Sequence, residues 1–94
     1  MEITNIIFER LNPQESGICA ILTLVIDDKL KVHKVKVVNG KKGLFVAFPY
    51  ISIQNNDNAQ ERRFIDLVEP TSSAVREELS NLVLNAYKER ISEM

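Results

Sequence analysis

The 94-residue sequence is poor in the residue types that build disulfides and metal sites. Its single cysteine, Cys19, cannot form a disulfide within the chain and lies in the apolar run 18–26. A lone cysteine in such a run is typical of a small core residue in a reducing compartment. His33 is the only histidine, so no cluster has zinc-ligand spacing, and we expect no metal and no cofactor.

The sequence also lacks a recognisable catalytic motif. A Ser-His-acid set would need His33 with partners such as Ser52 and Asp66, but no nucleophile motif surrounds them. The segment 40–43, Gly-Lys-Lys-Gly, lacks the spacing of a phosphate loop and the helix that should follow one, so we interpret it as a hairpin turn. We therefore expect neither an enzyme nor a small-molecule substrate.

Long apolar runs and a large net charge are missing as well. The longest apolar run is too short to span a bilayer, and residues 1–5 lack the basic start of a secretory signal. These features predict a cytoplasmic protein without a membrane partner. The formal net charge is −1, so the molecule as a whole exerts no strong pull on nucleic acid. Any such attraction must be local.

The sequence does contain a regular succession of strand patterns. Residues 3–10, 18–26, 29–38 and 44–48 are rich in β-branched and aromatic residues and are separated by turn signals. They predict an antiparallel meander whose second strand is apolar on both faces.

A helix pattern follows Pro70, with helix N-cap candidates at residues 71–73. Apolar residues then recur at helical spacing, at Val75, Leu79, Leu82, Val83 and Ala86. The whole pattern predicts an α+β fold in a single domain over residues 1–94, with a small antiparallel meander, a long hairpin and one C-terminal amphipathic helix. Because one helix covers only one face of the sheet, we expect a homodimer.

The apolar pattern of the third strand shifts by one residue near His33. A β-bulge there would return the apolar residues to one face and gather Lys29, Lys31, Lys34 and Lys36 on the other. With Lys41 and Lys42, residues 29–42 hold six lysines and no acid. Two interpretations remain open: a solvated strand face that discourages aggregation, or a cationic stripe that binds a ligand.

The segment after Pro49 predicts a hairpin. Tyr50, Ile51 and Ile53 would prolong a strand that pairs with residues 64–68, leaving residues 54–63 as a protruding tip. Arg62 and Arg63 near its returning strand are either solvated or suited to bidentate phosphate contact and base stacking.

Several segments carry a likeness to a known family. They are, in chain order, the alternating stretch 21–27, His33 in a valine-rich strand, NGKKGLFVAFP at 39–49, EPTSSAVR at 69–76 and LVLNAYKE at 82–89. In this order they resemble the SpoVG family of bacteria, the septation and stage V sporulation protein G group, over nearly the whole chain. The resemblance implies a small dimeric α+β protein that binds DNA and RNA as a regulator, with names that come from sporulation and cell-division phenotypes.

The segment after Pro49 departs from that family. The family typically follows this proline with Ser-Lys-Arg and later has Phe-Arg-Asp, and its nucleic-acid contacts are associated with these basic side chains. Here the matching positions read Tyr-Ile-Ser at 50–52 and Phe-Ile-Asp at 64–66. Arg62 and Arg63 stand just before Phe64, so the charge is displaced by a few residues.

Two functions are open at this point. The first is a dimeric nucleic-acid-binding regulator that contacts phosphates through Lys34, Lys36, Lys41, Lys42, Arg62 and Arg63. The second is a dimeric, non-enzymatic protein-interaction module that has lost the family's basic loop and recognises a partner through residues 50–53. The salt dependence of binding distinguishes them.

Overall fold

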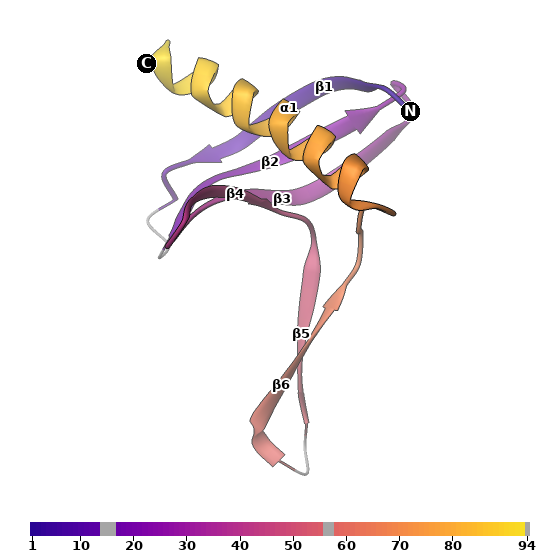
Figure 1. The fold of residues 1–94 in the computed structure, drawn as a ribbon, viewed down its shortest axis with the longest axis vertical. Coiled ribbons are helices and arrows are strands. Elements are labelled where there is room, and N and C mark those ends of the chain that lie inside the picture. Colours follow the sequence, from indigo (N-terminus) through magenta and orange to yellow (C-terminus); the bar gives the residue numbers. More distant parts are fainter. Residues whose placement is uncertain (14–16, 56–57, 94) are drawn as a thin grey trace.

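The computed structural model describes residues 1–13, 17–55 and 58–93. The elements are β1 (Ile3–Leu11), β2 (Ile18–Ile26), β3 (Leu30–Gly40), β4 (Gly43–Ala47), β5 (Tyr50–Asn55), β6 (Asn58–Asp66) and α1 (Ser73–Ser92). Strands β1 to β4 form an antiparallel sheet in sequence order, and β5 pairs only with β6. Figure 1 shows α1 across one face of the sheet and the β5–β6 hairpin projecting from the opposite side. The predicted α+β fold is confirmed.

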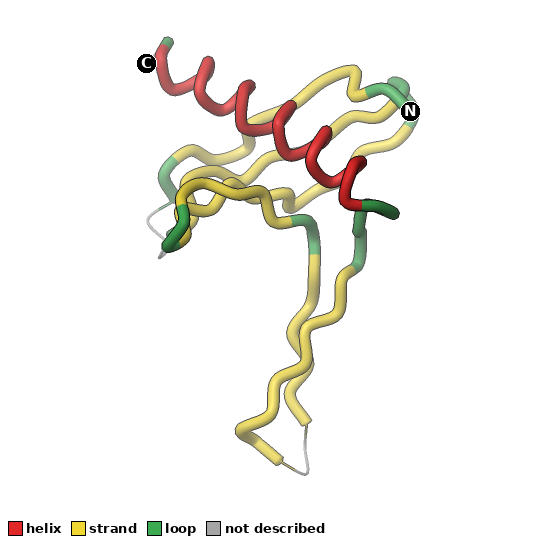
Figure 2. The backbone as a smooth tube through the Cα atoms, in the orientation of Figure 1, coloured by secondary structure: helices red, strands yellow, loops and turns green. Residues whose placement is uncertain are grey.

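The hydrophobic core lies between α1 and one face of the sheet. Side chains alternate along a strand, so Ala20, Leu22 and Leu24 of β2 point toward the helix. They pack with Val35 and Val37 of β3. The tube in Figure 2 shows that the helix covers only this face, while the hairpin stands apart from the four-stranded sheet. We call the sheet face turned away from α1 the open face.

Helix α1 begins after Ser72, whose Oγ accepts a hydrogen bond from the Val75 amide at 3.2 Å. Its buried residues are Leu79, Val83 and Tyr87, four residues apart. The prediction of Leu82 in the buried stripe is wrong, since this side chain is 44% exposed. A helix crossing a single sheet buries a narrow stripe, and Tyr87 extends that stripe in place of Leu82. No helix among the described residues has both the length and the hydrophobicity needed to cross a bilayer.

The turns of the meander follow from their residues. Asp27 and Asp28 both adopt positive φ, 51° and 52°, and the Lys29 amide donates to the Ile26 carbonyl at 2.9 Å. Aspartate tolerates this left-handed conformation, which matches the twist of a two-residue hairpin loop. At the next turn a Cβ on Gly40 would lie 2.8 Å from the Phe45 ring. A larger residue at this position would have to displace the Phe45 ring, which is 48% exposed.

The predicted β-bulge is present. Leu22 pairs with Val35 and Leu24 pairs with Val32, so Thr23 on β2 faces two residues of β3, His33 and Lys34. Lys34 takes a positive φ of 66°, the local distortion that absorbs the extra residue. The bulge returns Val35 and Val37 to the core, as their phase in the sequence required.

The paired strands of the β5–β6 hairpin are longer than predicted. Tyr50 pairs with Asp66 and Ser52 with Phe64, but pairing continues as far as Asn55 with Asn58. The prediction of residues 54–63 as a protruding tip is therefore wrong for residues 54–55 and 58–63, which lie in strands, and residues 56–57 lie outside the described residues. Polar residues continue the ladder because pairing satisfies their backbone groups.

Candidate nucleic-acid interface

The bulge places three lysines of β3 on the open face. Lys31 pairs with Val25 and Lys36 with Ile21, and both β2 partners alternate with core residues, so these two lysines point away from α1. Lys34 lines the same surface as Lys36. Lys29 was expected to share this face, but it lies in the turn before β3 and not in the strand. The predicted stripe is thus shorter by one residue.

A groove of about 560 Å³ crosses the open face from β1 to β3. Its lining includes the cations Arg10, Lys34 and Lys36, together with His33 and the carboxylate of Glu9. Three full positive charges against one negative charge make this part of the surface cationic, although the whole chain carries −1.

A buried hydroxyl organises the floor of this groove. Thr23 is 1% exposed, and its Oγ1 donates to Glu9 Oε1 at 3.1 Å and lies 3.0 Å from His33 Nδ1. Since the single hydroxyl proton goes to Glu9, His33 completes the chain by donating from Nδ1. The hydrogen bonds tie β1, β2 and β3 together at the bulge. His33 is thus held in place at the bulge by its contact with Thr23.

A second groove, of about 420 Å³, joins the open face to the base of the hairpin. Lys34 and Lys36 line both grooves, and Tyr50, Ile51 and Leu67 line the second. Lys36 Nζ lies 5.7 Å from the centroid of the Tyr50 ring. Lys34 and Lys36 of β3 therefore lie beside an aromatic side chain of β5, Tyr50.

The two faces of the hairpin differ in chemistry. Tyr50 and Phe64 lie on one face, with ring centroids 5.8 Å apart at an interplanar angle of 70°. By strand alternation the other face carries Ile51, Ile53 and Ile65 with Arg63. We call these the aromatic face and the isoleucine face. All of these side chains are exposed.

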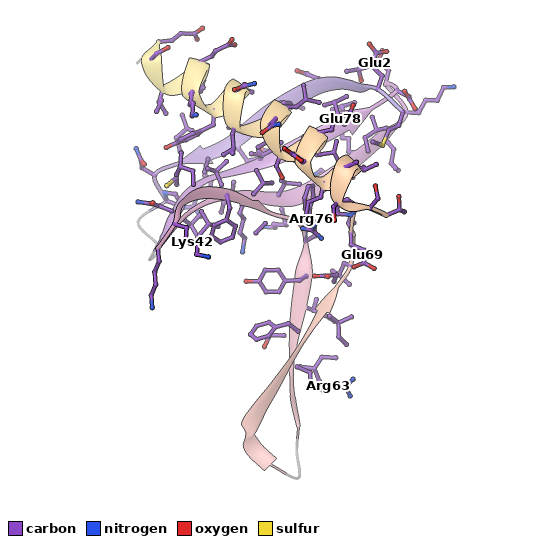
Figure 3. All side chains as sticks on the ribbon, in the orientation of Figure 1. Glu2, Lys42, Arg63, Glu69, Arg76 and Glu78 are labelled. Atoms are coloured by element: carbon purple, nitrogen blue, oxygen red, sulfur yellow. The ribbon has the colours of Figure 1, made fainter. Side chains whose placement is uncertain are left out.

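The basic residues predicted from the sequence do not form one cluster within a single chain. Lys34 and Lys36 come together, whereas Lys41 and Lys42 are exposed in the turn between β3 and β4. Figure 3 shows Lys42 and Arg63 far apart, with Arg63 directed away from the side of the hairpin on which Lys42 lies. The backbone of Arg62 pairs with Gln54, but its side chain lies outside the described residues.

No catalytic set is assembled from the residues considered above. Ser52 and Asp66 lie on the hairpin opposite Phe64 and Tyr50, whereas the hydrogen bond described for His33 goes to Thr23. Within the described ranges, no three His, Cys, Asp or Glu side chains gather as metal ligands would.

Three features of the site were missed in the sequence. Thr23 is the one polar residue inside the apolar run 18–26, and its position opposite the phase slip of β3 was the available signal. Tyr50 was assigned only to an apolar extension, because nothing in a linear sequence places it beside Lys36. Arg10 follows a register shift between Phe8 and Arg10 in β1 that the sequence pattern does not mark.

Comparison with known proteins identifies relatives along nearly the whole chain. Residues 1–89 match the family model described as SpoVG. A septation protein SpoVG of Agathobacter rectalis is 35% identical over 91 residues, which are 97% of this chain and 97% of that protein. A protein of the same name from Heliobacterium modesticaldum is 38% identical over 92 residues, covering 98% and 96% of the two chains. One from Shouchella clausii is 34% identical over 93 residues, covering 99% and 87%.

Proposed function

The chain belongs to the SpoVG family, and on that premise we propose that it is a dimeric, non-enzymatic regulator that binds DNA or RNA. The observation that carries the proposal is the convergence of Lys34, Lys36 and Arg10 on the open face, beside a hairpin that projects from the same side. Cations held on a sheet face at strand spacing suit the repeating phosphates of a nucleic acid backbone.

The contacts divide into a central group and an outer group. Lys34 and Lys36 lie between the two grooves and would contact phosphates in either of them. Lys41, Lys42, Arg62 and Arg63 belong to the outer group, at the end of the sheet and along the hairpin. Contacts of this kind supply affinity and register more than sequence reading, so the protein discriminates only modestly between sequences.

A homodimer would double these cationic sites by two-fold symmetry. The isoleucine face supports this part of the proposal, because Ile51, Ile53 and Ile65 are 40 to 43% exposed on a hairpin whose described residues pair with no other strand. An isolated two-stranded hairpin is only marginally stable in water. Burial of these three isoleucines against a second copy would stabilise it.

The same exposed hairpin favours a second candidate function. Residues 50–53 would serve as an apolar docking strip for another protein, with Ile51 and Ile53 on one face and Tyr50 on the other, in a module that does not bind nucleic acid. The two candidates differ in their response to salt. Phosphate contacts weaken steeply with ionic strength, whereas an apolar docking strip does not.

Fluorescence anisotropy with mixed-sequence oligonucleotides, titrated at several salt concentrations, tests the proposal. We expect the double variant Lys34→Ala/Lys36→Ala to bind more weakly and to lower the slope of log affinity against log salt by roughly two. The matched control is Lys88→Ala/Arg90→Ala, which removes the same charge from exposed positions on α1, the opposite side of the sheet. This control should keep most of the wild-type affinity and slope.

Two further variants rank the outer contacts. Arg62→Ala/Arg63→Ala should weaken binding and flatten the salt dependence, and Lys41→Ala/Lys42→Ala should have a smaller effect that is uniform across sequences. An unchanged salt titration for both the arginine and the Lys34/Lys36 variants would reject this interface. If the wild type binds no oligonucleotide at low salt, the protein-interaction candidate replaces the proposal.

A further inference from the structure

Beside the lysines, Tyr50 and Phe64 present exposed aromatic rings, which contribute nothing to the binding of phosphate groups. Tyr50 is 44% exposed and Phe64 is 66% exposed, although both rings are large and apolar. Their edge-to-face packing at 5.8 Å fixes the Tyr50 ring while leaving much of its surface in solvent. Exposed aromatic surface of this kind, held rigid next to cations, suits a flat ligand that carries negative charge.

We propose that Tyr50 stacks an unpaired base while Lys34 and Lys36 hold the adjoining phosphates, so that the protein prefers single-stranded nucleic acid over duplex. The inference rests on the proposed function and assigns the ligand class for its central contacts. Base stacking on an aromatic ring tolerates every base, so it adds affinity without requiring a particular sequence.

The geometry around Tyr50 supports this assignment. Lys36 Nζ lies 5.7 Å from the ring centroid, so a cation and a π-face occupy neighbouring positions on one surface. Both side chains line the groove of about 420 Å³ at the base of the hairpin, together with Lys34 and Pro49. A nucleotide in this groove would meet the ring with its base and the ammonium groups with its phosphate.

The connection between the grooves gives the strand a path. Lys34 and Lys36 line both the groove at Tyr50 and the groove that runs to Arg10 on β1. A flexible single strand can follow this path across the open face with successive phosphates near these cations. The bases of a duplex are stacked on one another inside the helix, so they cannot reach the Tyr50 ring without being unstacked.

A simpler function of the aromatic pair is to stabilise the hairpin. An edge-to-face pair contributes about 0.5–1.5 kcal/mol beyond its buried area. That role predicts a loss of hairpin stability on removal of the ring, and it predicts no difference between single-stranded and duplex ligands. The ligand comparison therefore separates the two roles.

The test measures the affinity of three probes by anisotropy at one fixed salt concentration. The probes are a labelled thymidine oligonucleotide, an abasic deoxyribose-phosphate oligomer of the same length, and a mixed-sequence duplex. We expect the wild type to bind the thymidine strand more tightly than the abasic oligomer, a comparison that needs no substitution. Tyr50→Leu should lower affinity for the thymidine strand roughly five- to one-hundredfold and leave the other two affinities unchanged. Tyr50→Phe, which keeps the ring, should retain wild-type binding.

Equal wild-type affinities for the thymidine strand and the abasic oligomer would overturn the inference. An equal loss on all three probes in Tyr50→Leu would overturn it too, since that pattern reports a damaged hairpin. In both cases the proposed function would stand, because phosphate binding persists in the wild type. Failure of the wild type to bind any of the three probes would reject the proposed function together with the inference.

Discussion

Single residues with unusual surroundings shape the open face. Thr23 is a buried polar residue in the central strand β2, and burying its hydroxyl without a partner would cost about 1–3 kcal/mol. Its contacts with Glu9 and His33 satisfy the hydroxyl and fix His33 at the bulge. The bulge in turn gives Lys34 its positive φ and its place beside Lys36. The position of the central lysines thus depends on a threonine in the middle of the sheet.

Tyr87 provides a pH-dependent test of the core. Burial raises the pKa of its phenol above the ordinary value of 10.0, and the neighbouring Cys19 thiol adds to the shift. Well below pH 10, near neutral pH, the phenol is neutral in the folded and unfolded chains alike. Above pH 10 the unfolded chain ionises more readily than the folded one, so Tyr87 lowers the free energy of unfolding as the pH rises.

We expect Tyr87→Phe to lose less stability than the wild type between pH 9 and pH 11, measured as the thermal midpoint by circular dichroism. At neutral pH the variant and the wild type should have similar thermal midpoints, because the variant keeps the buried aromatic ring. Tyr50→Phe, which removes a hydroxyl from an exposed ring, is the matched control and should follow the wild type. Parallel alkaline losses for wild type and Tyr87→Phe would contradict this assignment.

At the scale of elements, the sequence pattern predicted those features of the strands and the helix that depend on local periodicity. Alternation in β1 to β4, the phase slip in β3 and the Ser72 cap were all readable because each reflects a period or a turn within one segment. The length of the hairpin strands could not be predicted, because polar residues with high turn propensity also pair when the hydrogen bonds of the ladder satisfy their backbone groups. The contact between Lys36 and Tyr50 was not readable either, since it depends on the direction in which the hairpin leaves the sheet.

The hairpin element also carries the prediction about assembly. We expect light scattering at micromolar concentration to give the mass of a dimer for the wild type. Ile51→Ser/Ile53→Ser should shift the protein toward monomer, because it removes two exposed isoleucines from the isoleucine face. Leu82→Ser is a suitable control, since Leu82 is 44% exposed on α1 and Ile53 is 43% exposed on the hairpin. A wild type that is monomeric at this concentration would reject the dimer.

Over the whole molecule, charge is distributed unevenly around a net value of −1. Figure 3 shows Glu2 and Glu78 beside the sheet and α1, where Arg76 also lies, and Arg63 out on the hairpin, with Glu69 near its base. The lysines of β3 lie on the open face, away from α1. A net charge close to zero is therefore compatible with a local cationic surface, which the run of lysines in residues 29–42 indicated and the net charge did not.

The most direct measurement of the central claim is a map of where an oligonucleotide binds. In a two-dimensional amide NMR titration with a short single-stranded oligonucleotide, we expect the largest shifts in residues 31–36 of β3 and around Tyr50, with little change in the exposed residues of α1. Shifts confined to α1, or a spectrum unchanged at saturating oligonucleotide, would contradict the assignment of the open face as the nucleic-acid interface.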